Sequence, residues 1–366
     1  MSMAASLRQA RRRLAWLAPR RLSSAANLMS AGFSFALRRR RASRLPPMVK
    51  VDISPVCSLR CTACLHAEPE GRDKPLLSRQ RFSGAQKMEL ERFSALVKEL
   101  RGQTTALSLY YFGDPLAHPR FTEFVRIASD AGLMTHASTH LSYRLSDAKI
   151  AAIVSSGLSH ISVGVDGATQ ETYGVTRIGG RLDFILDNLE RLVIERRRQN
   201  SLTPVIEVQH LTFPHHPVGE AARVEAMVRA IGVDAFTVFE GAHLTPSGEL
   251  YNAVDTDPGA QASGAPRDAG ALPLCHWPYS GTVVKYDGDV IPCCKWREGQ
   301  QYAEDGEPRA VGNVFSQSLA EIWNGPAYQA IRREVARPAA GAEGSFCQGC
   351  PKLYRTASAL GDWQPG

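Results

Sequence analysis

Two kinds of hydrophobic pattern alternate along residues 48–240. Short runs rich in β-branched and aromatic residues predict six strands, at Met48–Ile53, Ala106–Phe112, Leu133–Ser138, His160–Val165, Val205–Leu211 and Val233–Phe239. Between them, apolar residues recur at helical spacing over Glu89–Leu100, Arg120–Ala131, Asp147–Ser155, Leu182–Arg198 and Val218–Ala230. Strands that alternate with helices in this way predict an α/β fold with a parallel sheet, either open or closed into a partial barrel.

The pattern changes after residue 240. Residues 241–274 are rich in Gly, Pro, Ala and Asp and hold few large apolar side chains, which indicates a linker. In residues 275–355, Gly288 within Tyr286–Asp289 predicts the turn of a β-hairpin. The expected domains are therefore 1–47, 48–240, the linker 241–274 and 275–355, followed by a tail at 356–366.

Residues 1–47 form a basic amphipathic arm. Twelve Lys or Arg and no Asp or Glu lie within residues 1–51, so the rest of the chain carries −5 of the formal net charge of +7. Charge gathered in an arm, rather than spread along a binding face, means that no nucleic-acid partner is expected. Several interpretations of the arm stay open: contact with an anionic membrane surface, packing against the body, a transit peptide, or a site for an acidic partner.

The composition is that of a folded protein without a membrane-spanning segment. Apolar residues make up 44% and charged residues 22% of the 366 residues, which excludes a mainly disordered chain. No apolar run is long enough to cross a bilayer as a helix. Because the chain shows no secretory signal peptide, we expect a cytoplasmic protein, which would be peripheral at the inner membrane face if the arm binds lipid.

The eight cysteines fall into two separated groups. Cys57, Cys61 and Cys64 form a C-x3-C-x2-C pattern directly after the first predicted strand. The second group comprises Cys275, Cys293, Cys294, Cys347 and Cys350. A long chain without a secretory signal favours metal sites over disulfides, and zinc is the simplest metal for such thiols. Three thiols without an obvious fourth ligand would instead suit a cubane iron–sulfur cluster with one open iron.

Further motifs follow other predicted strands. Gly113-Asp114-Pro115 comes after the second strand, and Asp166-Gly167 comes after the fourth. In parallel α/β folds the chemistry gathers at the carboxyl ends of the strands. We therefore expect these motifs and the three-cysteine loop to meet at one site.

Together these motifs resemble those of the radical S-adenosylmethionine superfamily. The resemblance rests on residues 51–64 (VDISPVCSLRCTAC), 111–119 (YFGDPLAHP) and 162–173 (SVGVDGATQETY), and it covers about residues 48–350. It implies a partial (βα)6 TIM-like barrel in which Cys57, Cys61 and Cys64 hold a [4Fe–4S] cluster. The open iron of that cluster binds S-adenosyl-L-methionine, whose reductive cleavage gives a 5′-deoxyadenosyl radical that removes hydrogen from a substrate.

The resemblance also implies contacts to S-adenosylmethionine. Gly113 and Asp114 match the family's Gly-Gly-Glu segment, which binds the methionyl ammonium, with Asp in place of the commoner Glu. Ser138 and Ser162 are candidates for binding the ribose or the carboxylate, and Arg177 is a candidate for binding the carboxylate.

The C-terminal cysteines resemble the twitch version of the SPASM extension. By this resemblance Cys275, Cys293, Cys347 and Cys350 hold one auxiliary [4Fe–4S] cluster, because the further cysteines of a full SPASM domain do not follow them. Cys294 is left over, as an alternative ligand or a buried thiol. The expected fold is therefore a partial barrel followed by a small cysteine-rich domain of a β-hairpin and helices.

The expected activity is that of a radical SAM oxidoreductase. A single auxiliary cluster suits the net oxidation of a small sugar-like, aminocyclitol-like or lipid-linked substrate, with electrons from a donor such as flavodoxin or ferredoxin. Such a step needs a general base, and the sequence identifies none. The candidates are Glu207, His210, His276, Lys285 and Asp287. Gln209, on the fifth strand, is a weaker candidate for the cofactor site.

Two other functions stay open. The chain could be a maturase that crosslinks or epimerises a ribosomally synthesised peptide, although the arm is smaller than the leader-binding domain of many such enzymes. A non-catalytic iron–sulfur or zinc adaptor protein is the remote alternative.

Overall fold

The computed structural model describes residues 22–62, 64, 85–241, 243–244, 250–251, 266–293, 309–339, 345–347, 350 and 352–354. Residues 1–21 of the predicted arm, Cys294, most of the predicted linker and the predicted tail lie outside these ranges. Within them, no helix has both the length and the apolar character needed to cross a membrane.

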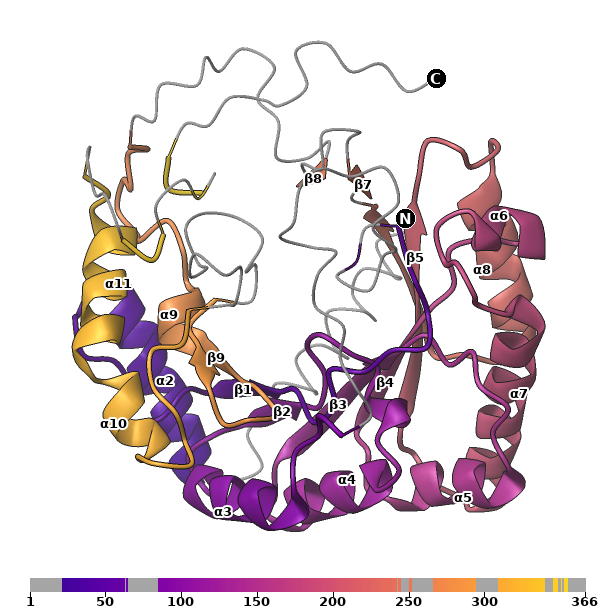
Figure 1. The fold of residues 1–366 in the computed structure, drawn as a ribbon, viewed down its shortest axis with the longest axis horizontal. Coiled ribbons are helices and arrows are strands. Elements are labelled where there is room, and N and C mark those ends of the chain that lie inside the picture. Colours follow the sequence, from indigo (N-terminus) through magenta and orange to yellow (C-terminus); the bar gives the residue numbers. More distant parts are fainter. Residues whose placement is uncertain are drawn as a thin grey trace.

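Six parallel strands build the predicted partial barrel. They are β1 (Met48–Val51), β2 (Ala106–Ser108), β3 (Met134–Thr139), β4 (His160–Gly164), β5 (Val205–Thr212) and β6 (Ala235–Glu240). Each strand pairs in parallel with the next one along the chain. The helical connections return the chain to the same end of the sheet each time, which places all six carboxyl ends at one edge. The predicted α/β fold is confirmed (Figure 1).

Five helices cover the outer face of this curved sheet (Figure 1). They are α3 (Leu90–Leu100), α4 (Phe121–Asp130), α5 (Asp147–Ser155), α7 (Leu182–Arg198) and α8 (Glu220–Ile231). Their apolar sides pack on the strands, with Phe93 of α3 and Phe124 of α4 fully buried and their ring centroids 4.8 Å apart. The short helices η1 (Pro115–Ala117) and α6 (Gln170–Gly174) follow β2 and β4. They shape the loops at the carboxyl ends of those strands.

The predicted C-terminal hairpin continues the barrel sheet. β9 (Gly281–Val284) pairs in parallel with β1, and β10 (Val290–Ile291) pairs antiparallel with β9, giving an eight-stranded sheet in the order β10-β9-β1-β2-β3-β4-β5-β6. The turn lies at Gly288, whose φ of +91° favours glycine. The hairpin is thus confirmed, whereas its pairing with β1 is a finding of the structure. Two further short strands, β7 (His243–Leu244) and β8 (Leu250–Tyr251), pair with each other.

Three helices near the C-terminus pack around one buried arginine. α9 (Trp277–Ser280), α10 (Leu319–Trp323) and α11 (Pro326–Ala336) surround the guanidinium of Arg332, which is fully buried. It donates hydrogen bonds to the carbonyl oxygens of Pro278 (2.8 Å), Trp323 (2.8 Å) and Arg40 (3.0 Å). Arg332 therefore joins these helices to the segment that precedes the barrel.

The described part of the arm packs against the body. Its helix α2 (Leu22–Ala36) lies beside α9, where Phe35 meets Tyr279 edge to face at 5.5 Å. Asn27 donates hydrogen bonds to the carbonyl oxygens of Leu45 (2.8 Å) and Gln103 (3.0 Å). These contacts fix one face of α2 on the protein and leave the other face outward.

Candidate active site

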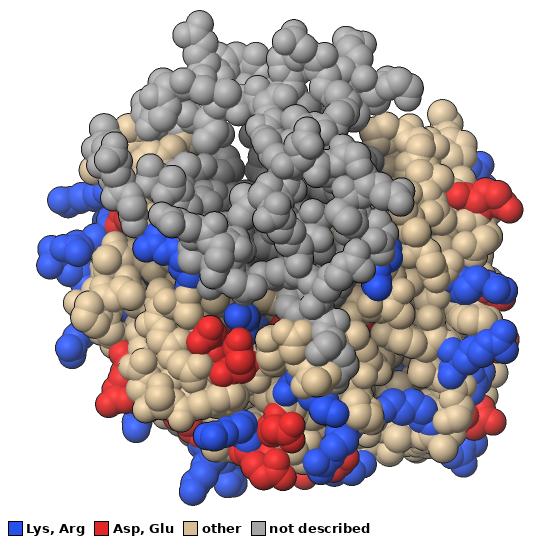
Figure 2. Space-filling view, viewed as in Figure 1, with Lys and Arg blue, Asp and Glu red and all other residues tan. Residues whose placement is uncertain are grey.

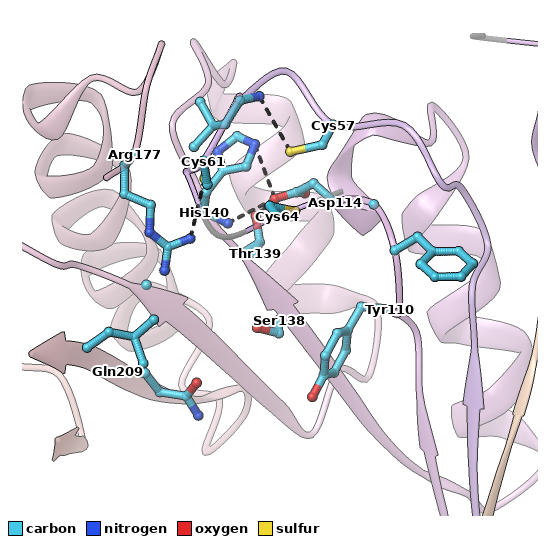
Figure 3. A pocket seen from close by; sticks show the side chains of 15 residues that line it. Cys57, Cys61, Cys64, Tyr110, Asp114, Ser138, Thr139, His140, Arg177 and Gln209 are labelled. Carbon is cyan, nitrogen blue, oxygen red and sulfur yellow. Dashed lines mark hydrogen bonds and ion pairs between the residues drawn. The ribbon is translucent and has the colours of Figure 1, made fainter. Parts of the chain in front are cut away.

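A cavity of about 190 Å³ lies at the carboxyl ends of the barrel strands. Its lining includes Cys57, Cys61, Cys64, Gly113, Asp114, Ser138, Arg177 and Gln209. In Figure 3 the three thiols and Asp114 lie on one side of the open space, Arg177 points into it from another, and Ser138, Tyr110 and Gln209 lie opposite the thiols. Most residues predicted to meet at one site therefore line this cavity. Ser162, Asp166 and Gly167 do not.

The three-cysteine loop is held by hydrogen bonds to a distant segment. The amides of Arg60 and Thr62 donate to the carbonyl oxygens of Ile178 (2.9 Å) and Thr176 (3.1 Å). Within the loop, the amide of Leu59 donates to the sulfur of Cys57 (3.4 Å). The loop after β1 and the segment after α6 thus support each other around the cavity.

Gly113 lets the loop after β2 approach the cysteine loop closely. A Cβ atom at this position would overlap the backbone at Ser54, Pro55 and Val56, directly before Cys57. The next residue, Asp114, donates its amide hydrogen to the Val56 carbonyl oxygen (3.0 Å). This close contact explains why the position requires glycine.

The carboxylate of Asp114 is bound by protein groups. It accepts hydrogen bonds from the Thr139 hydroxyl (2.7 Å), the His140 amide (2.9 Å) and the Leu116 amide (2.9 Å). Its side chain is nearly buried, at 2% exposure. Asp114 therefore ties the ends of β2 and β3 together, while the predicted contact with a methionyl ammonium stays a prediction. Thr139 and His140 also line the cavity, and nothing in their sequence context had indicated them.

Arg177 places a cation beside the thiols. Its Nε donates to Oδ2 of the fully buried Asp166 at 2.5 Å, and its Nη1 lies 4.0 Å from the sulfur of Cys61. Burial alone would lower the pKa of Arg177, but the charges of Asp166 and Cys61 outweigh it and hold the pKa above its usual value. The guanidinium is therefore charged and available to a carboxylate in the cavity.

Two predicted serines occupy different depths. Ser138 lines the cavity, as does Gln209. Ser162 instead lies below it, 1% exposed, with its hydroxyl 2.9 Å from Nε2 of His136 and 3.2 Å from Oε2 of Glu207. Both serine roles stay predictions, and Ser162 belongs to a second polar group of side chains.

That second group fills the barrel lumen below the cavity. Alternate residues of neighbouring strands point inward and hydrogen-bond to one another, unlike the branched apolar side chains that usually fill such barrels. The group comprises Lys50, Ser108, Tyr110, His136, His160, Ser162, Glu207, Gln209 and Thr237. The sequence signal for it is the polar residue at every second position of the strands, as in Glu207 and Gln209 of β5.

An acid–base pair lies within this lumen group. Nε2 of His160 is 3.1 Å from Oε2 of Glu207, whose other oxygen accepts a hydrogen bond of 2.6 Å from Thr237. Burial would raise the pKa of Glu207, but the hydrogen bonds from His160 and Thr237 lower it to about 2. Burial and the neighbouring His160 lower the pKa of His136 well below its usual value, which keeps that ring neutral.

The other candidate bases lie elsewhere. His210 alternates with Glu207 and Gln209 on β5, faces away from the lumen, and its Nδ1 is 2.8 Å from the Val165 carbonyl oxygen. Lys285 forms an ion pair with Asp287 (3.2 Å) in the C-terminal hairpin. His276 has its Nδ1 2.9 Å from the Ser280 hydroxyl. Of the candidates, only Glu207 lies in the lumen.

The donor set in the cavity fits an iron–sulfur cluster. Burial raises the pKa of the Cys57 and Cys61 thiols, so they are neutral unless a cation binds them. Soft thiolates select iron–sulfur clusters or zinc, and in a cluster each thiolate binds its own iron atom. Across the described ranges, no three His, Cys, Asp or Glu side chains are arranged to share one metal ion. Cys57, Cys61 and Cys64 would hold the cluster, with Arg177 and the Gly113 loop beside it.

The predicted auxiliary ligands also come together. Cys275, Cys347 and Cys350 pack against one apolar cluster that includes Val335 of α11. Burial raises the pKa of Cys347 well above its usual value, and Glu334 and the other three predicted ligands, Cys350, Cys293 and Cys275, raise it further. Cys347 and Cys350 are also joined directly, because the Cys350 amide donates to the Cys347 carbonyl oxygen (3.0 Å). The first site is linked to the predicted auxiliary ligands through Tyr111, whose hydroxyl donates to the Cys293 carbonyl oxygen (3.3 Å).

Comparison with known proteins identifies the domains that contain the two sites. The sequence model of the radical SAM superfamily matches residues 51–206, and that of an iron–sulfur cluster-binding domain, SPASM, matches residues 275–351. The chain is 24% identical over 311 residues to the tungsten-containing aldehyde ferredoxin oxidoreductase cofactor-modifying protein of Pyrococcus furiosus, covering 77% of this chain and 82% of that protein. It is 27% identical over 154 residues to the GTP 3′,8-cyclase of Chlorobaculum tepidum, covering 42% of this chain and 43% of the cyclase, less than half of that relative.

A solved structure shares the fold. SuiB of Streptococcus suis bound to S-adenosylmethionine superposes with a TM-score of 0.60 at 12% identity, over 86% of this chain and 77% of that one. The family matches imply a [4Fe–4S] cluster that binds S-adenosylmethionine, S-adenosylmethionine itself, and auxiliary iron–sulfur binding at the C-terminus. With the three-cysteine loop, the barrel and the C-terminal domain all in place, the chain belongs to the radical S-adenosylmethionine superfamily of enzymes and carries a C-terminal SPASM domain.

Proposed function

We propose that this enzyme is an oxidoreductase that dehydrogenates an alcohol or amine carbon of a polar substrate, sugar-like, aminocyclitol-like or lipid-linked. The observation that carries the proposal is the polar lumen directly below the cofactor cavity. Gln209 lines the cavity and reaches down to the Ser162 hydroxyl (3.3 Å) and to Glu207 (3.4 Å). A substrate with several hydroxyl or amino groups would find donors and acceptors at this depth, whereas an apolar substrate would leave them unpaired.

The His160–Glu207 pair supplies the proton acceptor that such an oxidation needs. When bound, the cofactors supply the one-electron chemistry: cleavage of S-adenosylmethionine, abstraction of the substrate hydrogen atom, and acceptance of the electron that the substrate gives up. The substrate hydroxyl must also lose its proton as the carbonyl forms. His160 would take this proton, and the ionised Glu207 would orient the imidazole and stabilise its charged form.

The test uses anaerobically reconstituted enzyme with dithionite and a panel of aminocyclitols and hexoses. We expect 5′-deoxyadenosine together with a product that has lost two hydrogens, identified by mass spectrometry. The triple variant Cys57→Ala/Cys61→Ala/Cys64→Ala should abolish both products. The double variant Cys347→Ala/Cys350→Ala should still form 5′-deoxyadenosine but no oxidised product, because the auxiliary site would no longer take up the electron.

The role of His160 has its own readout. His160→Gln should lower product formation without reducing cleavage of S-adenosylmethionine, because glutamine cannot accept the substrate proton. Ribosomal-type precursor peptides serve as the competing substrates. A crosslinked or epimerised peptide, formed while the whole aminocyclitol and hexose panel stays unreacted, would refute the proposal in favour of a maturase.

A further inference from the structure

Helix α2 presents its apolar side to solvent. Its buried residues are Ser24, Asn27, Ala31 and Ser34, all small or polar. Its large apolar side chains are exposed, with fractions of 92% for Leu22, 60% for Met29 and 64% for Phe33, followed by 60% for Leu37 just after the helix. At about 100° per residue, Leu22, Met29 and Phe33 lie on one narrow stripe. This is the reverse of the arrangement that a helix on a water-exposed surface normally shows.

The helix cannot turn this stripe inward. Asn27 is 5% exposed and donates hydrogen bonds to the carbonyl oxygens of Leu45 and Gln103. Rotation of the helix would break both bonds and bring a buried amide out of its polar contacts. Phe35 meets Tyr279 in the C-terminal domain, which fixes the end of the helix. The outward stripe is therefore part of the native packing.

A strongly basic segment adjoins the stripe. No charged residue occurs in Leu22–Leu37, and Arg38–Arg41 follow at once. Arg39, Arg40, Arg41 and Arg44 are exposed, and none of them forms an ion pair with a described residue. Around the barrel helices, Arg120 and Arg198 are paired with Glu123 and Glu195, whereas Arg126 and Arg197 form no ion pair with a described residue.

More arginines lie beside this segment. Arg40 lines a surface cavity of about 420 Å³ together with Arg333 of α11 and Arg337, which directly follows α11. Figure 2 shows Lys and Arg side chains along the left-hand edge, where Figure 1 places α2, α10 and α11, and also along the lower and right-hand edges. We call the exposed stripe of α2 together with residues 39–44, Arg333 and Arg337 the α2 face.

We propose that the α2 face binds the surface of an anionic lipid bilayer. Met29, Phe33 and Leu37 would enter the boundary between headgroups and acyl chains, and the unpaired arginines would meet the lipid phosphates. An uncharged apolar stripe with flanking arginines is the pattern of helices that lie in this interface. Binding through this face places α11 and the auxiliary site near the lipid and leaves the barrel helices α5, α7 and α8 in water.

A second copy of the chain fits this face less well. A symmetric dimer brings the same patch of both subunits together, so Arg39–Arg41 of both copies would be gathered in one interface. Like charges opposed in an interface are repulsive. An acidic protein surface would neutralise the arginines, but its charged side chains would not cover the apolar side chains of Met29 and Phe33.

The test is flotation of the full-length holoenzyme with vesicles, under anaerobic conditions. We expect binding to vesicles of phosphatidylglycerol and phosphatidylcholine in equal parts, little binding to pure phosphatidylcholine, and a loss of binding as salt is raised. Met29→Glu/Phe33→Glu should lower the partition coefficient at least about tenfold, and Arg39→Glu/Arg41→Glu should do the same. Both variants should still cleave S-adenosylmethionine in solution at the wild-type rate, which separates this proposal from the proposed reaction.

Matched controls come from the barrel helices. Ile194→Glu changes an apolar α7 side chain that is 55% exposed. Arg126→Glu/Arg197→Glu reverses two exposed arginines of α4 and α7 that form no ion pair with a described residue. These variants should bind vesicles like the wild type. Equal binding to anionic and neutral vesicles, or equal losses in the control variants, would overturn the proposal. So would a dimer in solution that Met29→Glu/Phe33→Glu dissociates, or an acidic flavodoxin that binds this face while vesicles do not.

Discussion

At the residue scale, Gly113 is the position where one added methyl group should disturb the cofactor site. In Gly113→Ala the new Cβ would overlap the backbone of residues 54–56, which must move by a few tenths of an ångström or more and carry Cys57 with them. We expect reduced iron loading of the first cluster and at least tenfold slower cleavage of S-adenosylmethionine, because a displacement of this size misplaces a ligand. Iron and sulfide analysis and 5′-deoxyadenosine assays measure both. Gly32→Ala, at a glycine with open space around it, should change neither.

The sequence predicted those site residues that lie close to one another along the chain. Cys57, Cys61 and Cys64 follow a strand at a spacing that limits them to one site, and the structure places all three on one cavity. Thr139 and His140 were missed because their role is to bind Asp114, twenty-five and twenty-six residues earlier in the chain. The depth of Ser162 was missed as well, since alternation along a strand shows which face a residue occupies and not how far down the barrel it lies.

At the element scale, periodicity predicted the barrel and little beyond it. The strands and helices of residues 48–240 carry strong period-two or helical patterns, and α7 has the predicted bounds. β9 has four residues, all buried, and its parallel pairing with β1 depends on contacts between segments more than two hundred residues apart. The sequence also could not predict which side of α2 is buried. In a helix without charged residues, contacts with distant residues decide this, here with Leu45, Gln103 and Tyr279.

The packing of α9, α10 and α11 predicts that substitutions of two adjacent arginines, Arg332 and Arg333, change the stability of this region by unequal amounts. Arg332→Lys removes the planar fork that serves the carbonyl oxygens of Pro278, Trp323 and Arg40. Buried acceptors left unpaired should lower the free energy of unfolding of this region by about 2–4 kcal/mol. Hydrogen exchange of the α11 amides measures that loss. Arg333→Lys, at the exposed neighbour, should leave the exchange unchanged, and equal effects of the two substitutions would contradict this account of the helix packing.

At the scale of the whole molecule, the seam between the barrel and the C-terminal hairpin contains a buried acid. Asp52 follows β1, its amide donates to the Val284 carbonyl oxygen of β9 (2.8 Å), and its side chain is fully buried. Among the described residues, the Gly113 and Phe112 amides interact with its carboxyl group, but neither forms a hydrogen bond of good geometry with it. Burial raises the pKa of Asp52 to about 7, against the lowering effects of the Gly113 and Phe112 amides and of Lys285. The acid is thus largely protonated in the folded protein at pH values where it is ionised in the unfolded chain.

This difference in pKa predicts how the stability of the enzyme depends on pH. Between the unfolded pKa near 4 and the folded value of about 7, the native state binds the extra proton, so stability falls as pH rises and then levels off above 7. Asp52→Asn is neutral throughout and should escape this loss. The stability of the variant relative to the wild type should therefore grow by roughly 2 kcal/mol from pH 5.5 to 7 and then stay constant to pH 8.5. Denaturant unfolding of the holoenzyme under anaerobic conditions measures it, with Asp130→Asn on the exposed side of α4 as the control. If the difference in free energy of unfolding between Asp52→Asn and the wild type stays constant across this pH range, Asp52 keeps its charge when it is buried in the folded protein.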